Sequence, residues 1–175
     1  VKKWSWGNSE SDKIYHDPET RKNSISFRSN LSRLSEVLIS EGKFKEAEEI
    51  IDLAFSKMPI DYYGYYSLWT PFIQGYYKIG RDDKAKEIFK KISFKYSDKL
   101  NYYSSLEIYN QYDVGEEIIA DIERFRNLIE TAQNSGEKEI LSDQIKSFIA
   151  SSEKFNYIYG EYDYYISLSN FILSL

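Results

Sequence analysis

Apolar residues recur at intervals of three and four positions along the first third of the chain, on both sides of a glycine. Phe27, Leu31, Leu34 and Leu38 precede Gly42. This spacing places apolar side chains on one face of an α-helix. A second row follows the glycine and consists of Phe44, Ala47, Ile51, Ala54 and Met58. The pattern predicts two helices joined at Gly42, where glycine supplies the positive φ that ends the first helix.

A similar stretch returns 38 residues further along the chain. The sequences EGKFKEAEEII and IGRDDKAKEIF align without gaps, so that Gly80 corresponds to Gly42 and Ala85 to Ala47. A repeat of this length built from paired helices is typical of stacked helical hairpins. We predict that the two alanines mark close contacts between helices. The large side chains predicted to be buried with them are Leu34, Leu38, Ile51, Phe72, Phe89 and Ile92.

A looser third pair of helices follows. Apolar spacing predicts one helix over 113–134, ending before Ser135–Gly136, and a return helix over 137–153. The first of these carries Ile118, Ile122, Phe125, Ile129 and Ala132. The tail EYDYYISLSNFILSL fits either a capping helix or an edge strand, and we predict a helix. The chain is thus predicted to be one all-α repeat domain, divided into a linker 1–17, hairpins 18–59 and 67–97, a degenerate hairpin 113–153 and a C-terminal cap 154–175.

The connection between the first two hairpins is rich in tyrosine. Residues 62–66 are expected to form a turn, followed by the first helix of the second hairpin. Either Ser67 or Thr70 is expected to cap that helix, with Pro71 in its first turn. The helix is expected to carry Trp69, Phe72 and Tyr76 on its apolar side.

Composition narrows the class of protein. A chain of 175 residues suits a single domain with its own core. The net charge of −5 argues against a dedicated nucleic-acid binder, because phosphate contacts need clustered Lys and Arg. The absence of cysteine excludes disulfides and thiolate metal sites. Since the chain begins with Val1 and VKKWSWGN has no apolar signal-peptide core, we expect a piece of a larger protein.

The two aligned hairpins resemble tetratricopeptide repeats. Ala47 and Ala85 occupy the small-residue position of that repeat, and Pro59 closes the first unit. Ser97 stands where the second unit would have its proline, and the spacing exceeds the usual 34 or so residues. The resemblance implies antiparallel helical hairpins stacked as a right-handed array.

Five further stretches occur in an order that resembles one bacterial protein family. They are WSWGN at 4–8, FRSNLSRLSEVLISEGK at 27–43, KMPID at 57–61, YYSLWTPFIQGYYKIG at 65–80 and KLNYYSSL at 99–106. Together they are similar to the soluble C-terminal region of large multi-pass membrane proteins related to protein O-mannosyltransferases. The resemblance implies a membrane glycosyltransferase-like parent, with this part on the periplasmic or other extracytoplasmic side. Glycosyl transfer and membrane attachment would then belong to an N-terminal region that this sequence does not contain.

Candidate catalytic chemistry is sparse. His16 is the only histidine, so with Asp17 it lacks the further His or Cys ligands of a typical zinc site. A Ser–His–Asp triad would have to use His16, and no nucleophile-elbow motif occurs. DPETR instead predicts a helix start, with Asp17 as cap, Pro18 in the first position and Glu19 in the first turn. The acidic residues Glu46, Glu48, Glu49 and Asp52 follow helical spacing and indicate a solvated face. We expect no enzymatic activity, metal or cofactor in this chain.

Binding residues are expected on surfaces that the predicted core leaves free. The outward positions of the first helix of each hairpin are predicted to be Ser32, Glu36, Ile39, Thr70, Gln74, Tyr77 and Lys78. Tyrosines outside the buried stripe are available to stack on a sugar or peptide. The candidate binding residues are Glu36, Ile39, Tyr62, Tyr63, Gln74, Tyr77 and Lys78.

The leading expectation for function is a non-catalytic interaction or scaffolding domain with a protein or peptide partner. A carbohydrate-binding module that uses exposed tyrosines is the first alternative. An independent soluble peptide-binding adaptor is the second. No nucleic-acid partner is expected.

Overall fold

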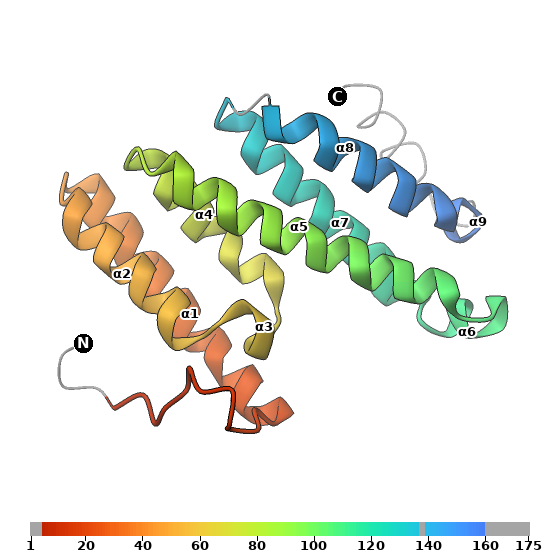
Figure 1. Ribbon diagram of the computed structural model, residues 1–175, viewed down its shortest axis with the longest axis horizontal. Helices are drawn as coiled ribbons and strands as arrows, with labels where there is room; N and C mark the ends of the chain where they lie inside the picture. Colours follow the sequence, from red (N-terminus) through yellow and green to blue (C-terminus); the bar gives the residue numbers. More distant parts are fainter. Residues whose placement is uncertain (1–4, 137–138, 160–175) are drawn as a thin grey trace. The chain divides into compact units, whose positions relative to one another are not determined.

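The computed structural model describes residues 5–136 and 139–159, and every regular element within those ranges is a helix (Figure 1). The predicted all-α class is confirmed for this part of the chain. Packing divides the chain into two compact units, Val1–Ile88 and Phe89–Leu175. The first contains α1 (Pro18–Ser40), α2 (Phe44–Lys57), α3 (Ile60–Tyr63), η1 (Tyr66–Trp69) and α4 (Thr70–Lys78). Helix α5 (Asp82–Ser105) begins in the first unit and ends in the second, before α6 (Ile108–Asp113), α7 (Gly115–Asn134), α8 (Glu139–Ser152), η2 (Glu153–Phe155) and α9 (Asn156–Tyr159).

In the first unit, α1 and α2 form an antiparallel hairpin, and α4 packs against both helices (Figure 1). Gly75 of α4 permits a close approach, because a β-carbon there would lie 2.9 Å from Cδ1 of Ile51. The burial predicted for the two repeat alanines and their neighbours is largely confirmed. Ala47, Ala85, Ile51, Phe72, Phe89 and Ile92 are all fully buried.

Gly42 and Gly80 end α1 and α4 with the same hydrogen-bond pattern. Their φ values are 72° and 74°. In each turn the glycine amide donates to the carbonyl three residues back, and the next amide donates to the carbonyl five residues back, over 2.8–3.1 Å. These are Schellman motifs. The predicted left-handed glycine at each helix end is confirmed.

The buried face of α1 is polar, and on this point the sequence-based prediction is wrong. Leu34 is 38% exposed and Leu38 is only half-buried. Ser32, predicted to face outward, is inside. The helix can bury serines because two of them donate their hydroxyls to carbonyls of the preceding turn. The buried residues of α1 are Ser24, Arg28, Ser32 and Ser35.

Arg28 explains why this face is turned inward. Its Nη1 donates to the carbonyls of Gly64 at 2.8 Å and Tyr65 at 3.4 Å, and its Nη2 donates to Ser24 Oγ at 2.7 Å. The guanidinium also lies 5.2 Å from the ring centre of Trp69, within cation–π range. Burial lowers the pKa of Arg28 to about 10, so the side chain stays charged at neutral pH. Turning the leucine row inward would take this donor away from both carbonyls.

The tyrosine-rich connection is more helical than the predicted turn. It consists of α3, then Gly64 and Tyr65 with φ values of 61° and 47°, then η1. The predicted cap of α4 is absent, since Thr70 is the first helical residue and neither Ser67 nor Thr70 makes a capping bond. Trp69 of η1 is fully buried, so tertiary packing fixes the start of α4 without a cap.

The solvated acidic face predicted on α2 is observed for Glu46 and Glu49, which are exposed, whereas Glu48 and Asp52 are half-buried and paired. Glu48 pairs with Arg81 and accepts from Lys84 Nζ at 2.8 Å. Asp52 accepts from Lys84 at 2.7 Å and from the hydroxyl of Tyr76 at 2.6 Å. The hydrogen bond from Lys84 lowers the pKa of Glu48. These contacts tie α2 to the residues around the second glycine turn.

In the second unit, α7 and α8 form a hairpin (Figure 1). Gly136 has a φ of 82° just after the end of α7, in agreement with the predicted boundary. Helix α5 runs past the predicted end at Ser97 to Ser105, because no proline or glycine interrupts it. The apolar row predicted for α7 is fully buried: Ile118, Ile122, Phe125, Ile129 and Ala132.

The C-terminal cap predicted over 154–175 falls mostly on residues 160–175, which lie outside the described part. The division into one repeat domain stays a prediction. None of the helices in the described ranges combines the length and apolar content needed to cross a bilayer.

Candidate ligand-binding cavity

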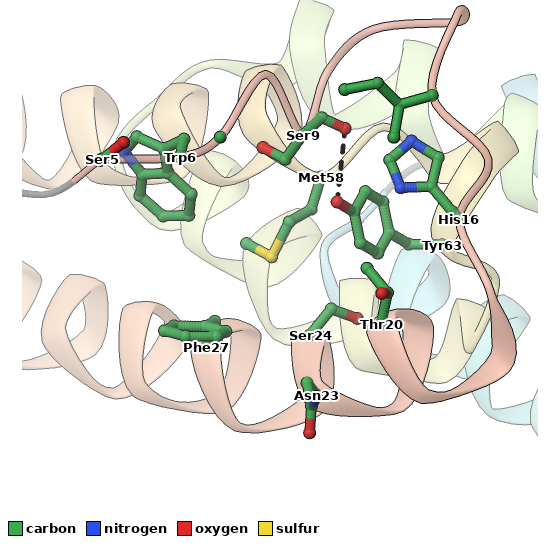
Figure 2. A pocket seen from close by; sticks show the side chains of 12 residues that line it. Ser5, Trp6, Ser9, His16, Thr20, Asn23, Ser24, Phe27, Met58 and Tyr63 are labelled. Carbon is green, nitrogen blue, oxygen red and sulfur yellow. Dashed lines mark hydrogen bonds between the residues drawn. The ribbon is translucent and has the colours of Figure 1, made fainter.

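A cavity lies where the N-terminal segment, residues 5–16, folds back over the first hairpin (Figure 2). Its volume is about 260 Å³. Six of its twelve lining residues come from this segment and four from α1, and the other two are Met58 and Tyr63. We call it the His16 cavity, after the histidine in its wall.

Three contacts hold the segment in place. Ser9 donates its hydroxyl to the carbonyl of Lys57 at 2.6 Å, and its own carbonyl accepts from the hydroxyl of Tyr63 at 3.3 Å. Glu10 pairs with Lys57 Nζ at 2.6 Å, and this hydrogen bond lowers the pKa of the Glu10 carboxyl. Burial raises the pKa of Tyr63, so its hydroxyl remains a donor at neutral pH.

The start of α1 fixes another wall of the cavity. Asp17 caps the helix, accepting from the Thr20 amide at 2.9 Å and from the Thr20 hydroxyl at 2.8 Å. These bonds lower the pKa of Asp17. The cap, with Pro18 and Glu19 after it, confirms the prediction from DPETR. Because the cap sets where α1 begins, it places His16 directly before the first turn.

His16 is buried against two aromatic rings. It is 8% exposed, and its ring centre lies 5.5 Å from that of Tyr62 and 4.8 Å from that of Tyr63. The interplanar angle with Tyr62 is 13°, so those two rings are stacked. Neither imidazole nitrogen has a hydrogen-bond partner among the described residues. Buried polar atoms are nearly always paired, so this imidazole is a group that a ligand can satisfy.

Aromatic and apolar side chains form the rest of the wall. Trp6 and Phe27 lie with ring centres 6.4 Å apart, and Met58 lies between this pair and Tyr63 (Figure 2). Asn23 of α1 is exposed, and its side chain points away from the cavity (Figure 2). Apolar walls with a few polar groups are typical of small-molecule sites of about 300–1,000 Å³. The smaller His16 cavity suits a ligand the size of one sugar ring or one amino acid.

The groups around His16 bear on the chemistry of this cavity. Within residues 5–136 and 139–159, no hydroxyl or carboxylate is hydrogen-bonded to His16, and no cluster of three or more potential metal ligands occurs. General-base and triad mechanisms need an imidazole that is oriented by such a partner. The residues in place provide aromatic surfaces for stacking and an imidazole for hydrogen bonding.

The candidate binding residues from the sequence fall into two groups. Tyr62 and Tyr63 contact His16, but Tyr63 is 3% exposed, so the expectation that it lies on an open surface is wrong. The remaining candidates do not line the cavity. Glu36, Gln74 and Lys78 are exposed, whereas Ile39 and Tyr77 are half-buried. A shared binding surface for these five residues stays a prediction.

Most of the cavity was not identified from the sequence. Phe27 and Met58 belong to the predicted core rows, and Trp6 belongs to the predicted linker. The sequence pattern around His16 bears only on metal binding, catalysis and the start of a helix. The available signal was the number of ring-bearing residues in a short predicted linker, among them Trp6 and His16.

Comparisons of the chain with protein-family models, with curated proteins and with solved structures found no match. The geometry of the cavity and the pattern of the sequence therefore carry the functional interpretation.

Proposed function

We propose that this chain is a non-catalytic carbohydrate-binding domain whose ligand site is the His16 cavity. The observation that carries the proposal is the combination of aromatic walls with a buried imidazole that has no partner among the described residues. A sugar ring presents C–H faces that pack on aromatic rings such as Trp6 and Phe27. Its hydroxyls can both donate to and accept from the imidazole of His16. The volume of about 260 Å³ suits one sugar ring.

The sequence resemblance supports this proposal and supplies a context for it. In that context the chain is an interaction or scaffolding part of a membrane glycosyltransferase-like protein, on the extracytoplasmic side. Its role would be to hold a glycan close to the enzyme. The proposed carbohydrate site is thus the His16 cavity and not a surface of exposed tyrosines.

We also propose that the first two hairpins are units of a tetratricopeptide-like array. The matching Schellman motifs at Gly42 and Gly80 support this, because they recur at the repeat spacing. The buried alanines at the corresponding positions Ala47 and Ala85 support it as well.

The test is a titration of the purified chain with a panel of monosaccharides and free amino acids, followed by two-dimensional NMR. We expect at least one sugar to shift the amide signals of Trp6, Phe27 and Tyr63 together. Phe27→Ala should weaken binding while preserving the fold, since Phe27 is only half-buried. Phe94→Ala is the matched control, because Phe94 is 67% exposed and lies in the other unit.

Two results would contradict the proposal. Shifts caused by amino acids and by no sugar would favour a peptide-binding domain instead. Glycosyl-transfer or glycosidase activity in the purified chain would contradict the non-catalytic assignment.

A further inference from the structure

We infer that the sugar bound in the His16 cavity is an acidic one, whose carboxylate is held by His16 and Arg21. This inference rests on the proposed function. It begins with a second, more open hollow whose lining includes Lys13, Arg21 and Tyr62. His16 lines both the cavity and this hollow. A sugar ring in the cavity can therefore extend a substituent past the imidazole toward Arg21.

Arg21 is one of two cationic residues that line the hollow, together with Lys13. Its Nε is buried and has no hydrogen-bond partner in the described part of the chain. Leaving a buried donor unpaired costs free energy, and the cost is larger for a charged group. Arg21 and His16 thus both line the hollow, and both have buried nitrogens without a hydrogen-bond partner among the described residues.

The charges around the hollow favour an anion. Lys13 and Arg21 line it together with one carboxylate, that of Asp12. Two neighbouring carboxylates are already engaged, Asp17 with Thr20 and Glu10 with Lys57. The hollow is therefore locally cationic in a chain whose net charge is −5.

A carboxylate satisfies this arrangement better than a neutral group does. Each of its oxygens accepts hydrogen bonds, and charge-assisted bonds from a guanidinium are roughly twice as strong as neutral ones. One oxygen can accept from Arg21 Nε and the other from an imidazole N–H of His16. The hydroxymethyl group of a neutral hexose carries no charge to match that of Arg21. Stacking on Tyr62 fixes the imidazole of His16, which lines both the His16 cavity and the hollow.

The experiment measures dissociation constants by calorimetry for matched pairs of sugars. The pairs are glucose with glucuronate, galactose with galacturonate and mannose with mannuronate, and acetate serves as a carboxylate without a ring. For at least one pair we expect the acid to bind about tenfold or more tightly than its neutral partner. The same acid should bind more tightly than acetate, because acetate cannot fill the aromatic cavity.

Two variants test whether Arg21 and His16 cause the preference for an acidic sugar over its neutral partner. Arg21→Gln removes the cation, and His16→Phe keeps a ring against Tyr62 and Tyr63 while removing both nitrogens. In each we expect the ratio of the two dissociation constants to fall close to unity. A merely structural role would weaken the acid and the neutral sugar equally and leave the ratio unchanged. Lys22→Gln is the control, since Lys22 is exposed on α1 and lines neither hollow.

The outcomes separate the inference from the proposed function. Equal affinities for an acid and its neutral partner would overturn the inference and leave a neutral sugar site. Binding of acetate as tightly as any acidic sugar would also overturn it. If no sugar binds at all, the proposed function itself fails. Should His16→Phe not fold, the ratio measured with Arg21→Gln decides.

Discussion

Nη1 of Arg28 lies 2.8 Å from the carbonyl oxygen of Gly64, and this bond joins the middle of α1 to the tyrosine-rich connection. The partners of this fully buried cation are two backbone carbonyls and a serine hydroxyl. Positive φ values at Gly64 and Tyr65 bring both carbonyls to one guanidinium. An irregular backbone and a buried charge thus stabilise each other.

Replacing Arg28 with methionine should destabilise the first unit by about 2–3 kcal/mol, because the carbonyls of Gly64 and Tyr65 lose a buried donor. Arg28→Lys should recover only part of this loss, since an ammonium lacks the planar fork that reaches several acceptors. Urea unfolding measures the effect. Arg33→Met, at an exposed position of the same helix, is the control. Equal stability of Arg28→Met and the unsubstituted chain would disprove the anchoring role.

Tyr76 should make the protein labile at alkaline pH. Burial, and then the hydrogen bond to Asp52, raise the pKa of Tyr76 above its usual value. Above about pH 10 the unfolded chain loses this proton while the folded chain keeps it, so the free energy of unfolding falls as pH rises. This contribution is fully present below about pH 10 and is lost at higher pH.

Tyr76→Phe should therefore lose less stability than the unsubstituted chain between about pH 9 and pH 11. Urea midpoints across that range test the prediction. Part of the decrease in stability with rising pH should remain in Tyr76→Phe, because burial also raises the pKa of Tyr63 and Tyr103. Tyr102→Phe, at a position 60% exposed, should leave the pH dependence unchanged. If the stability of Tyr76→Phe fell with pH as steeply as that of the unsubstituted chain, Tyr76 would not be a source of the alkaline lability.

Valine at Gly42 or Gly80 should cost about 1 kcal/mol or more, because a β-branched residue disfavours positive φ. A β-carbon at either site meets no atom within 4 Å, so the cost is one of backbone conformation alone. Asparagine should cost less, since it tolerates the left-handed region. Thermal unfolding of the four variants tests this order, and equal costs for valine and asparagine would speak against it.

Gly75→Ala provides a contrast, because its cost should come from crowding against Ile51. The added β-carbon would lie 2.9 Å from Cδ1 of Ile51. Ile51→Val removes that atom, so it should partly rescue Gly75→Ala in a double-mutant cycle. The same substitution should not rescue Gly42→Val. Strict additivity for Gly75→Ala and Ile51→Val would contradict the contact.

Leucine at Ala47 or Ala85 should overpack the core and cost about 1–3 kcal/mol. Both alanines are fully buried. Ala150→Leu, on the exposed side of α8, should change stability by no more than about 0.5 kcal/mol. Unfolding in urea distinguishes the three variants. If Ala47→Leu and Ala85→Leu were as stable as Ala150→Leu, the repeat alanines would not mark close contacts.

Features set by local chemistry were predictable from the sequence. Glycine after an apolar row gave the helix ends at Gly42 and Gly80, and Asp17 followed by Pro18 gave the start of α1. The buried row of α7 followed from its spacing alone. Each of these depends on residues within a few positions of one another.

Features that depend on distant partners were not predictable. The buried face of α1 is decided by the carbonyls at Gly64 and Tyr65, 36 and 37 positions from Arg28. The cavity likewise needs His16 to meet Tyr62 and Tyr63 across the whole of the first hairpin. The tyrosine doublet was recognisable as a candidate, but its histidine partner was not. Apolar periodicity contains no information about such polar and aromatic contacts.

Half of the residues around the His16 cavity belong to residues 5–16, which contain no helix and are held at Ser9 and Glu10. Such a segment can open locally while α1 and α2 remain folded. A ligand in the cavity would add its binding free energy to the closure of the segment. Ligand binding would then increase the mechanical stability of the segment. If the chain were pulled from its N-terminal side, the segment would open and release the ligand before any helix unfolded. A bound ligand would raise the force needed to open the segment.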